Sequence, residues 1–223
     1  MSDADFAFIG DVHGVAPPLG AVLDALGGSR HLVFLGDYVN RGPDSKAVLE
    51  MLVGADATWP SMVTLLRGNH DEELLNFLAS GDLARFVAFG GLPTIASYSG
   101  GVTNSIAHFR ETFPESHRDL LVNLEDYFER QDVFASHCGP NPERPSSRDR
   151  RDVVMGSHQE LFRLDMKHLA GKSVVCGHYV QRAMVPFAAR GLYAIDTGSG
   201  SMSGGPLTVL LWPEREFVQF GGL

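Results

Sequence analysis

The fold is indicated by a pattern that first occurs at residues 6–14, which read FAFIGDVHG. A short apolar run is followed by glycine and then by the polar side chains Asp11 and His13. The same order returns at residues 32–37 (LVFLGD), 62–71 (MVTLLRGNHD), 133–137 (VFASH), 174–178 (VVCGH) and 192–196 (LYAID). Short apolar runs bounded by glycine or a small residue are typical of buried strands rather than helices.

Helical patterns lie between these predicted strands. Apolar residues recur at helix spacing over 19–26, where Gly27-Gly28 supplies a stop, and a second helix is expected over 45–52 after Pro43-Asp44. Further helices are expected over 72–78, 116–124 and 158–169. This alternation predicts an α/β fold, with strands inside and helices outside.

The remaining segments complete the predicted organisation. Residues 207–212 and 216–220 are rich in β-formers between turn residues, which predicts antiparallel strands. Residues 140–151 read as a polar surface loop, and 81–101 as another loop that influences substrate choice. The proline-rich, polar composition of 140–151 would also suit a domain linker, but the pattern of strands ending in polar residues continues on both sides of it, so we expect one domain over residues 1–223.

Composition excludes several classes of protein. The formal net charge of −9 argues against a nucleic-acid binder, which would carry a basic face. Cys138 and Cys176 form no CxxC motif, which favours a reducing, cytoplasmic location. No apolar run approaches the roughly 20 residues of a membrane helix, and residues 1–5 lack the features of a secretory signal. We therefore expect neither a nucleic-acid nor a membrane partner.

The polar residues at the strand ends are candidate ligands. Ligands of open α/β sheets bind beyond the carboxyl ends of the strands. A single Asp or His at such a position is often only a cap or a turn residue, but turn chemistry gives no reason for histidine to recur. The candidates are Asp11, His13, Asp37, Asn69, His137 and His178.

The donor types narrow the chemistry. Imidazole, carboxylate and carboxamide groups suit Mn²⁺, Fe or Zn²⁺ and are too rich in nitrogen for a Ca²⁺ site. They also exceed the three protein ligands that a single catalytic zinc needs. The sequence therefore predicts two divalent ions, about 3.5–4 Å apart and bridged by one carboxylate, that activate water to hydroxide for attack at phosphorus.

Three motifs in order carry a resemblance to a known family. Residues 10–14 (GDVHG) match GDxHG, residues 36–42 (GDYVNRG) match GDxVDRG with one change, and residues 68–71 (GNHD) match GNH[DE]. The chain thus resembles the calcineurin-like metallophosphoesterases, and within them the compact bacterial serine/threonine members of the phosphoprotein phosphatase family. The resemblance extends over residues 5–212 and implies a layered β-sandwich flanked by helices.

The resemblance also implies roles. Asp11, His13 and His178 would hold one metal, and Asn69 and His137 the other, with Asp37 as the bridge. The implied catalytic residues are His70, as the acid that protonates the leaving oxygen, with Arg41 and Asn40; the implied substrate-binding residues are Arg41, Asn69 and Arg67. For Arg67 a structural pairing with a carboxylate is an equal alternative.

Two positions depart from the family pattern. Asn40 stands where the protein-phosphatase branch has an Asp that accepts a hydrogen bond from the acid histidine, so the donor role of His70 should be weaker. Cys138 follows His137 where alanine is common, and we expect it to be a small residue at the edge of the core. Asp196 is expected to support the site by orienting a ligand histidine.

Three functions follow as hypotheses. The first is hydrolysis of phosphate monoesters, either phosphoserine and phosphothreonine in proteins or small molecules. The alternative, based on Asn40 and Asp71, is symmetrical hydrolysis of dinucleoside tetraphosphates. A third is a non-catalytic protein that binds a phosphorylated partner. The sequence leaves the natural substrate, the metal and the oligomeric state open.

Overall fold

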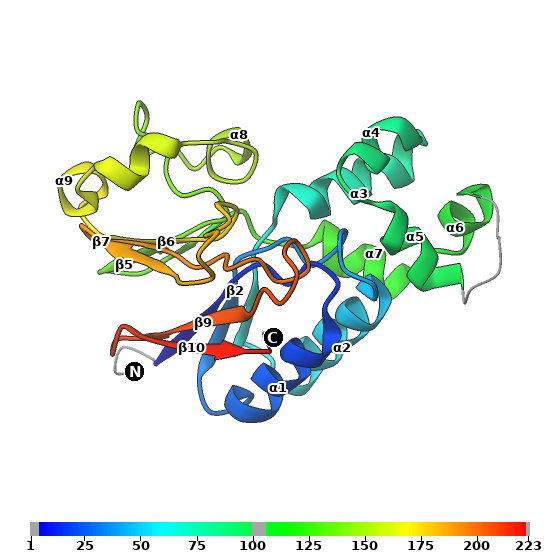
Figure 1. Cartoon of the computed structure of the whole chain (residues 1–223), viewed down its shortest axis with the longest axis horizontal. Helices are drawn as coiled ribbons and strands as arrows, with labels where there is room; N and C mark the ends of the chain where they lie inside the picture. The colour runs from blue at the N-terminus through cyan, green and yellow to red at the C-terminus, as the bar shows by residue number, and fades with distance from the viewer. Residues whose placement is uncertain (1–4, 100–105, 222–223) are drawn as a thin grey trace.

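The computed structural model describes residues 5–99 and 106–221 and contains two five-stranded sheets packed face to face (Figure 1). The first sheet has the order β10 (Glu216–Phe220), β9 (Leu207–Trp212), β1 (Phe6–Ile9), β2 (His31–Phe34), β3 (Val63–Leu65). The second has the order β4 (Phe128–Glu129), β5 (Val133–Ala135), β6 (Ser173–Cys176), β8 (Leu192–Ala194), β7 (Phe187–Ala189). The predicted layered α/β fold is confirmed.

Parallel strands occupy the centre of each sheet. β1, β2 and β3 run parallel, as do β5, β6 and β8. Their carboxyl ends therefore meet at one edge of each sheet, as a shared site requires. β9 pairs antiparallel with both β1 and β10, which confirms the antiparallel strands expected near the C-terminus.

Strand β1 shows how alternation builds the layers. Phe6 and Phe8 belong to the core between the sheets, where the Phe8 ring lies 6.0 Å from Phe128 and 6.3 Å from Trp212. Ala7 and Ile9 point the other way, into the core beneath the helices. Successive side chains of a strand face opposite sides, so a strand that is apolar throughout must be covered on both faces.

Helices cover the outer faces of both sheets (Figure 1). Those against the first sheet are α1 (Ala16–Leu26) and α2 (Ser45–Thr58). Those against the second are α8 (Arg150–Val153), the 3-10 turn Gln159–Arg163 and α9 (Met166–Ala170). Both sheets share the inner core, which supports our proposal that the chain is one domain. None of the helices in the described residues is long and apolar enough to cross a membrane.

A further group of helices follows β3. It comprises α3 (Asn69–Ser80), α4 (Leu83–Ala88), α5 (Leu92–Ser99), α6 (Ile106–Thr112) and α7 (Glu115–Val122). The expectation that 81–101 is a loop was wrong over α4 and α5, while Gly100 and Gly101 lie outside the described residues. α4 begins because Asp82 accepts a hydrogen bond from the Arg85 amide, and it stays folded because Phe86 stacks on Phe77 at 4.5 Å.

Other helix boundaries also differ from expectation. α2 begins at Ser45 as expected, capped by Asp44, but continues to Thr58 rather than ending at Leu52. The single helix expected over 158–169 is interrupted, because Leu164 is extended and Asp165 caps a new helix by accepting from the amides of Lys167 and His168. The loop expected over 140–151 is free of helix and strand over 140–149, but α8 begins at Arg150, capped by Asp149, and includes its last two residues.

Candidate metal centre

The predicted ligand side chains converge where the strands end. The Asp37 Oδ2 atom lies 3.5 Å from His13 Nε2 and 3.4 Å from His137 Nε2. The Asn69 Oδ1 atom lies 2.9 Å from the same His137 nitrogen. Asp11 Oδ, Asp37 Oδ and a His137 ring nitrogen also lie within 4.8 Å of one another. The Asp37 carboxylate thus lies between His13 and His137, which suits the bridging role expected for it.

Backbone carbonyls orient two of the histidines. The His13 Nδ1 atom lies 3.0 Å from the Val39 carbonyl, and the His137 Nδ1 atom lies 2.9 Å from the Leu35 carbonyl. When Nδ1 donates its proton to a carbonyl, the Nε2 lone pair is left facing the centre. Both rings are fully buried and are therefore held in this orientation.

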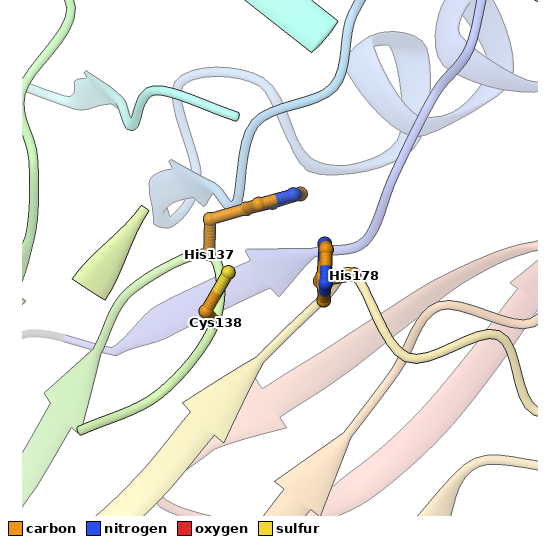
Figure 2. A group of neighbouring side chains, drawn as sticks. All are labelled: His137, Cys138 and His178. Carbon is orange, nitrogen blue, oxygen red and sulfur yellow. The ribbon is translucent and has the colours of Figure 1, made fainter. Parts of the chain in front are cut away.

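His178 corrects the grouping that the resemblance implied. Its ring does not join Asp11 and His13: the Nδ1 atom lies 3.0 Å from Asn69 Oδ1, and the ring centroid is 5.1 Å from that of His137. Figure 2 shows the two rings close together after β5 and β6. Its backbone amide, not its ring, contacts Asp11, at 3.1 Å from Oδ2. This position favours grouping the His178 ring with Asn69 and His137.

Two glycines allow this convergence. A Cβ atom on Gly177 would lie 2.0 Å from Asp11 Oδ1, and one on Gly68 would lie 2.1 Å from Asp37 Oδ1. Any larger residue would have to displace a ligand carboxylate. The glycines of the GNHD and GH segments are therefore required by the close approach of backbone to ligand.

Strained backbone marks the same region. His13, Asp37, Asn40, Arg41 and His178 all have positive φ, at 46°, 55°, 70°, 67° and 62°. Such conformations cost a non-glycine residue free energy and persist only where the surrounding structure holds them. Their concentration at the strand ends indicates a functional constraint rather than an accident of turn geometry.

The buried carboxylates of the cluster are in an environment that a bound cation would stabilise. Burial, and then the neighbouring Asp196, raise the pKa of Asp11 well above its ordinary value. Burial raises the pKa of Asp196 to about 6, and its buried Oδ2 atom has no hydrogen-bond partner among the residues that the structure describes. Burial opposes ionisation of Asp37 too, but His137 and His70 outweigh it and hold its pKa well below the ordinary range. Crowded, buried carboxylates beside imidazole nitrogens fit a divalent metal centre.

Asp71 is a support that the sequence did not identify as such. Its buried carboxylate accepts hydrogen bonds from the amides of Gly68 (3.0 Å), Asp37 (2.8 Å) and Tyr38 (2.9 Å). It thereby ties the GNHD segment to the loop that carries Asp37. An acidic residue in the first turn of α3, three positions after Gly68, is the only signal that sequence offers for this role.

Arg41 lies against two imidazoles at the edge of the centre. Its Nη1 atom is 3.1 Å from His13 Nε2, and its Nη2 atom is 3.0 Å from His70 Nε2. The guanidinium fork is therefore placed beside both the donor set and the candidate acid, in a position to hold phosphate oxygens.

His70 is held by Asn40. The Asn40 Nδ2 atom lies 3.2 Å from His70 Nδ1, while Asn40 Oδ1 accepts a hydrogen bond from Thr94 Oγ1 at 2.9 Å. Thr94 in turn lies 2.9 Å from Ser45 Oγ. Burial lowers the pKa of His70. Sequence reasoning did not identify Thr94 or Ser45.

Arg67 takes no part in this arrangement. Its Nη1 atom donates to Glu72 at 3.1 Å, and its Nη2 atom donates to the carbonyls of Val122 and Leu124 at 3.0 and 3.2 Å. These contacts join α3 to the end of α7. The geometry supports the structural alternative for Arg67 rather than substrate binding.

Cys138 is buried beside His137 (Figure 2). Its thiol donates to the Val154 carbonyl at 2.9 Å, and burial raises its pKa well above the ordinary value. This agrees with the expected packing role at the edge of the core.

Fold and donor set together define a metal-dependent hydrolase of phosphate esters. The chain belongs to the calcineurin-like phosphoesterase family, whose model matches residues 4–182. A relative that aligns over most of the chain is the asymmetrical bis(5'-nucleosyl)-tetraphosphatase PrpE of Oceanobacillus iheyensis, with 25% identity over 94% of this chain and 89% of that protein. The serine/threonine-protein phosphatase sitA of Aspergillus fumigatus is 52% identical over 42 residues, 19% of this chain and 11% of its own.

A solved structure agrees in fold. The crystal structure of a candidate diadenosine tetraphosphatase superposes with a TM-score of 0.67 and 20% identity, covering 100% of this chain and 95% of that one. The relatives of this chain thus include both dinucleoside tetraphosphatases and protein phosphatases.

Proposed function

We propose that the chain hydrolyses phosphoanhydride bonds in dinucleoside tetraphosphates at a binuclear metal centre. The observation that carries this choice of substrate is the contact between the Asn40 amide and His70 Nδ1. An amide carries no charge, so it cannot stabilise a protonated imidazole as a carboxylate would. His70 is therefore a poor source of a proton for the departing oxygen.

The quality of the leaving group decides which substrates such a site can accept. An alkoxide released from phosphoserine is a strong base and needs a proton from an acid as it departs. A nucleoside phosphate released from a phosphoanhydride is a much weaker base and departs without one. A weak acid at His70 therefore favours phosphoanhydrides over alkyl phosphates.

The comparisons support the same substrate class. The tetraphosphatase relative aligns across nearly the whole chain, whereas the similarity to sitA is confined to a short segment. The earlier alternative thus becomes the leading hypothesis, and the position of cleavage is left to product analysis.

Different residues would bind the metal ions, the phosphate and the departing oxygen. Asp37 would bridge two ions, with Asp11 and His13 on one side and Asn69, His137 and His178 on the other. Arg41 would hold the oxygens of the phosphate under attack, and His70 would hydrogen-bond to the departing oxygen. Two divalent ions, when bound, would lower the pKa of water and neutralise charge on phosphate.

Manganese is our proposed metal and cytoplasm our proposed location. The mixed nitrogen and oxygen donor set suits Mn²⁺, and admits Fe or Zn²⁺ as well. No thiolate belongs to the proposed set, because the Cys138 thiol donates to a backbone carbonyl.

The test is a product analysis with purified protein and Mn²⁺ on diadenosine tetraphosphate. Two ADP molecules would mark symmetrical cleavage, and ATP with AMP would mark asymmetrical cleavage. Either result supports the proposal if Asp37→Ala abolishes it. The proposal would be contradicted if the protein failed to hydrolyse diadenosine tetraphosphate but rapidly hydrolysed phosphoserine peptides.

Phosphate monoester hydrolysis is the second candidate. It is favoured by the position of Arg41, which lies beside His13 and His70 and needs only one phosphate to contact. A panel of p-nitrophenyl phosphate, phosphoserine and phosphothreonine peptides separates it from the first. Binding of these compounds without turnover of any would instead favour a non-catalytic role.

A further inference from the structure

A cavity beside the metal centre has no role in the chemistry described so far. Its volume is about 600 Å³, and it is lined by Arg41, Val180, Arg182, Ser201 and Met202. A separate cavity of about 390 Å³ lies on the side of His70 and Phe89, and it too reaches Arg41. Arg41 lines both of these cavities and a third of about 500 Å³ beside Pro43 and Leu92, and each is within the size range of small-molecule sites, about 300–1,000 Å³.

The walls of the larger cavity are fixed to the metal centre. Val180 and Arg182 lie two and four residues after the candidate ligand His178, and the Gln181 amide donates to the Asp196 carbonyl at 2.8 Å. On the other wall, the Ser199 hydroxyl donates to the Val12 carbonyl at 3.0 Å. Gly200 approaches His13 so closely that a Cβ atom would lie 2.3 Å from its carbonyl oxygen. The cavity is therefore placed by the same loops that place the ligands.

Its chemistry is that of a site for a nucleoside phosphate. Two arginines line it, and none of the described residues along its wall is acidic. In the part of the chain that the structure describes, the exposed guanidinium of Arg182 has no ion pair or hydrogen bond, so its donors are available to phosphate oxygens. Val180 and Met202 add apolar surface, and a thioether packs well against an aromatic base.

We propose that Arg182 binds a second phosphate of the substrate, next to the one held by Arg41, with the attached nucleoside lying against Val180 and Met202. This inference rests on the proposed function, which requires a substrate with several linked phosphates. It assigns Arg182 as the residue that distinguishes such a substrate from a simple monoester, because a single phosphate held at Arg41 does not need it.

Calorimetric titration of the Mn²⁺-loaded protein with ADP tests this binding without relying on turnover. Arg182→Gln should weaken ADP binding about tenfold, since a charge-assisted contact is lost, and leave inorganic phosphate binding unchanged. The matched control is Arg190→Gln, which removes an exposed arginine from the turn between β7 and β8 and should change neither. Equal ADP affinity in all three proteins, or no ADP binding by the unaltered protein, would overturn the assignment.

Kinetics distinguish failure of this inference from failure of the proposed function. Arg182→Gln should raise KM for diadenosine tetraphosphate about tenfold and leave kinetics with p-nitrophenyl phosphate unchanged. If the unaltered protein hydrolyses the tetraphosphate and Arg182→Gln affects both substrates equally, the subsite is wrong and the function stands. If the unaltered protein does not hydrolyse the tetraphosphate, the proposed function is wrong, and the ADP titration alone shows whether Arg182 binds a phosphate.

Discussion

The Asn40 Nδ2 atom lies 3.2 Å from His70 Nδ1, so the candidate acid is positioned by a neutral amide. Beyond Asn40, the hydroxyls of Thr94 and Ser45 extend the series of hydrogen bonds, and each can donate or accept a hydrogen bond. This series of hydrogen bonds accommodates either orientation of the Asn40 amide, and in neither orientation does it place a charge beside His70. His70 is held in place without being made a stronger base.

Replacing this amide should change which substrates are hydrolysed. In Asn40→Asp, a carboxylate would accept a hydrogen bond from the His70 Nδ1–H group and favour the protonated ring. We expect kcat to rise about tenfold or more for alkyl phosphates, whose leaving oxygens need a proton, and to change little for p-nitrophenyl phosphate. Steady-state kinetics on a series of phosphate esters checks this. Equal changes for alkyl and aryl esters would count against an acid role for His70.

Gly177→Ala should disrupt the metal centre. The new Cβ atom would meet Asp11 Oδ1 at 2.0 Å, so the carboxylate must move. We expect loss of bound metal and a fall in kcat of about a hundredfold or more. Elemental analysis and activity assays provide the measurement. Gly54→Ala in α2, where a Cβ atom meets nothing within 4 Å, is the control and should leave both unchanged. Full metal content in Gly177→Ala would show that the approach is not required.

Asp71→Asn should destabilise the fold. The buried carboxylate accepts from three backbone amides, and an Asn side chain replaces one acceptor oxygen with a donor. We expect a loss of about 2 kcal/mol in the free energy of unfolding, with weaker metal binding because the Asp37 loop is released. Urea denaturation of the metal-free protein measures the first effect. The exposed Asp56→Asn should be neutral, and similar midpoints for both variants would contradict the role of Asp71.

Arg41 and Arg67 should behave differently when each is removed. Arg41→Ala should lower kcat/KM by about a hundredfold, because phosphate loses its guanidinium contact, with little change in stability. Arg67→Met should lower the melting temperature, since Glu72 and the carbonyls of Val122 and Leu124 lose their donor, but leave KM unchanged. Parallel kinetics and thermal unfolding separate the two. A raised KM in a folded Arg67→Met protein would restore it as a substrate ligand.

Metal binding should release protons. Burial lowers the pKa of His137, but Asp37 and Asp11 outweigh burial and raise it to about 10 in the metal-free protein. Below that pH the ring carries a proton that an incoming metal must displace, so acidification weakens binding. We expect Mn²⁺ affinity to rise about tenfold per pH unit near neutrality from this group alone. Calorimetry in buffers of different ionisation enthalpy counts the protons. A pH-independent affinity with no proton release would rule out His137 as a ligand.

The strand ends were predictable because their pattern is local. Apolar runs followed by glycine and a polar residue identified β1, β2 and β6. The parallel strands then bring Asp11 and Asp37 to the carboxyl edge of the first sheet and His178 to that of the second. What sequence could not supply is the orientation of each ring. The His178 amide, rather than its ring, lies against Asp11, and this depends on the path of the loop after β6.

The supporting interactions could not be predicted because they join residues that are far apart in the sequence. Thr94 contacts Asn40 across 54 positions of sequence, and Arg182 reaches a cavity whose other wall follows β8. No periodicity or motif links such pairs. The helices α4 and α5 were missed because short helices, held by a cap and by aromatic packing, leave little periodic signal in sequence.

The most direct test is anomalous diffraction from crystals of the protein loaded with Mn²⁺, compared with the Asp37→Asn variant. We expect two ions about 3.5–4 Å apart, with the Asp37 carboxylate between them and the His178 ring on the side of Asn69 and His137. In Asp37→Asn, occupancy of at least one ion should fall. A single ion, or two ions too far apart to share Asp37, would contradict the binuclear centre.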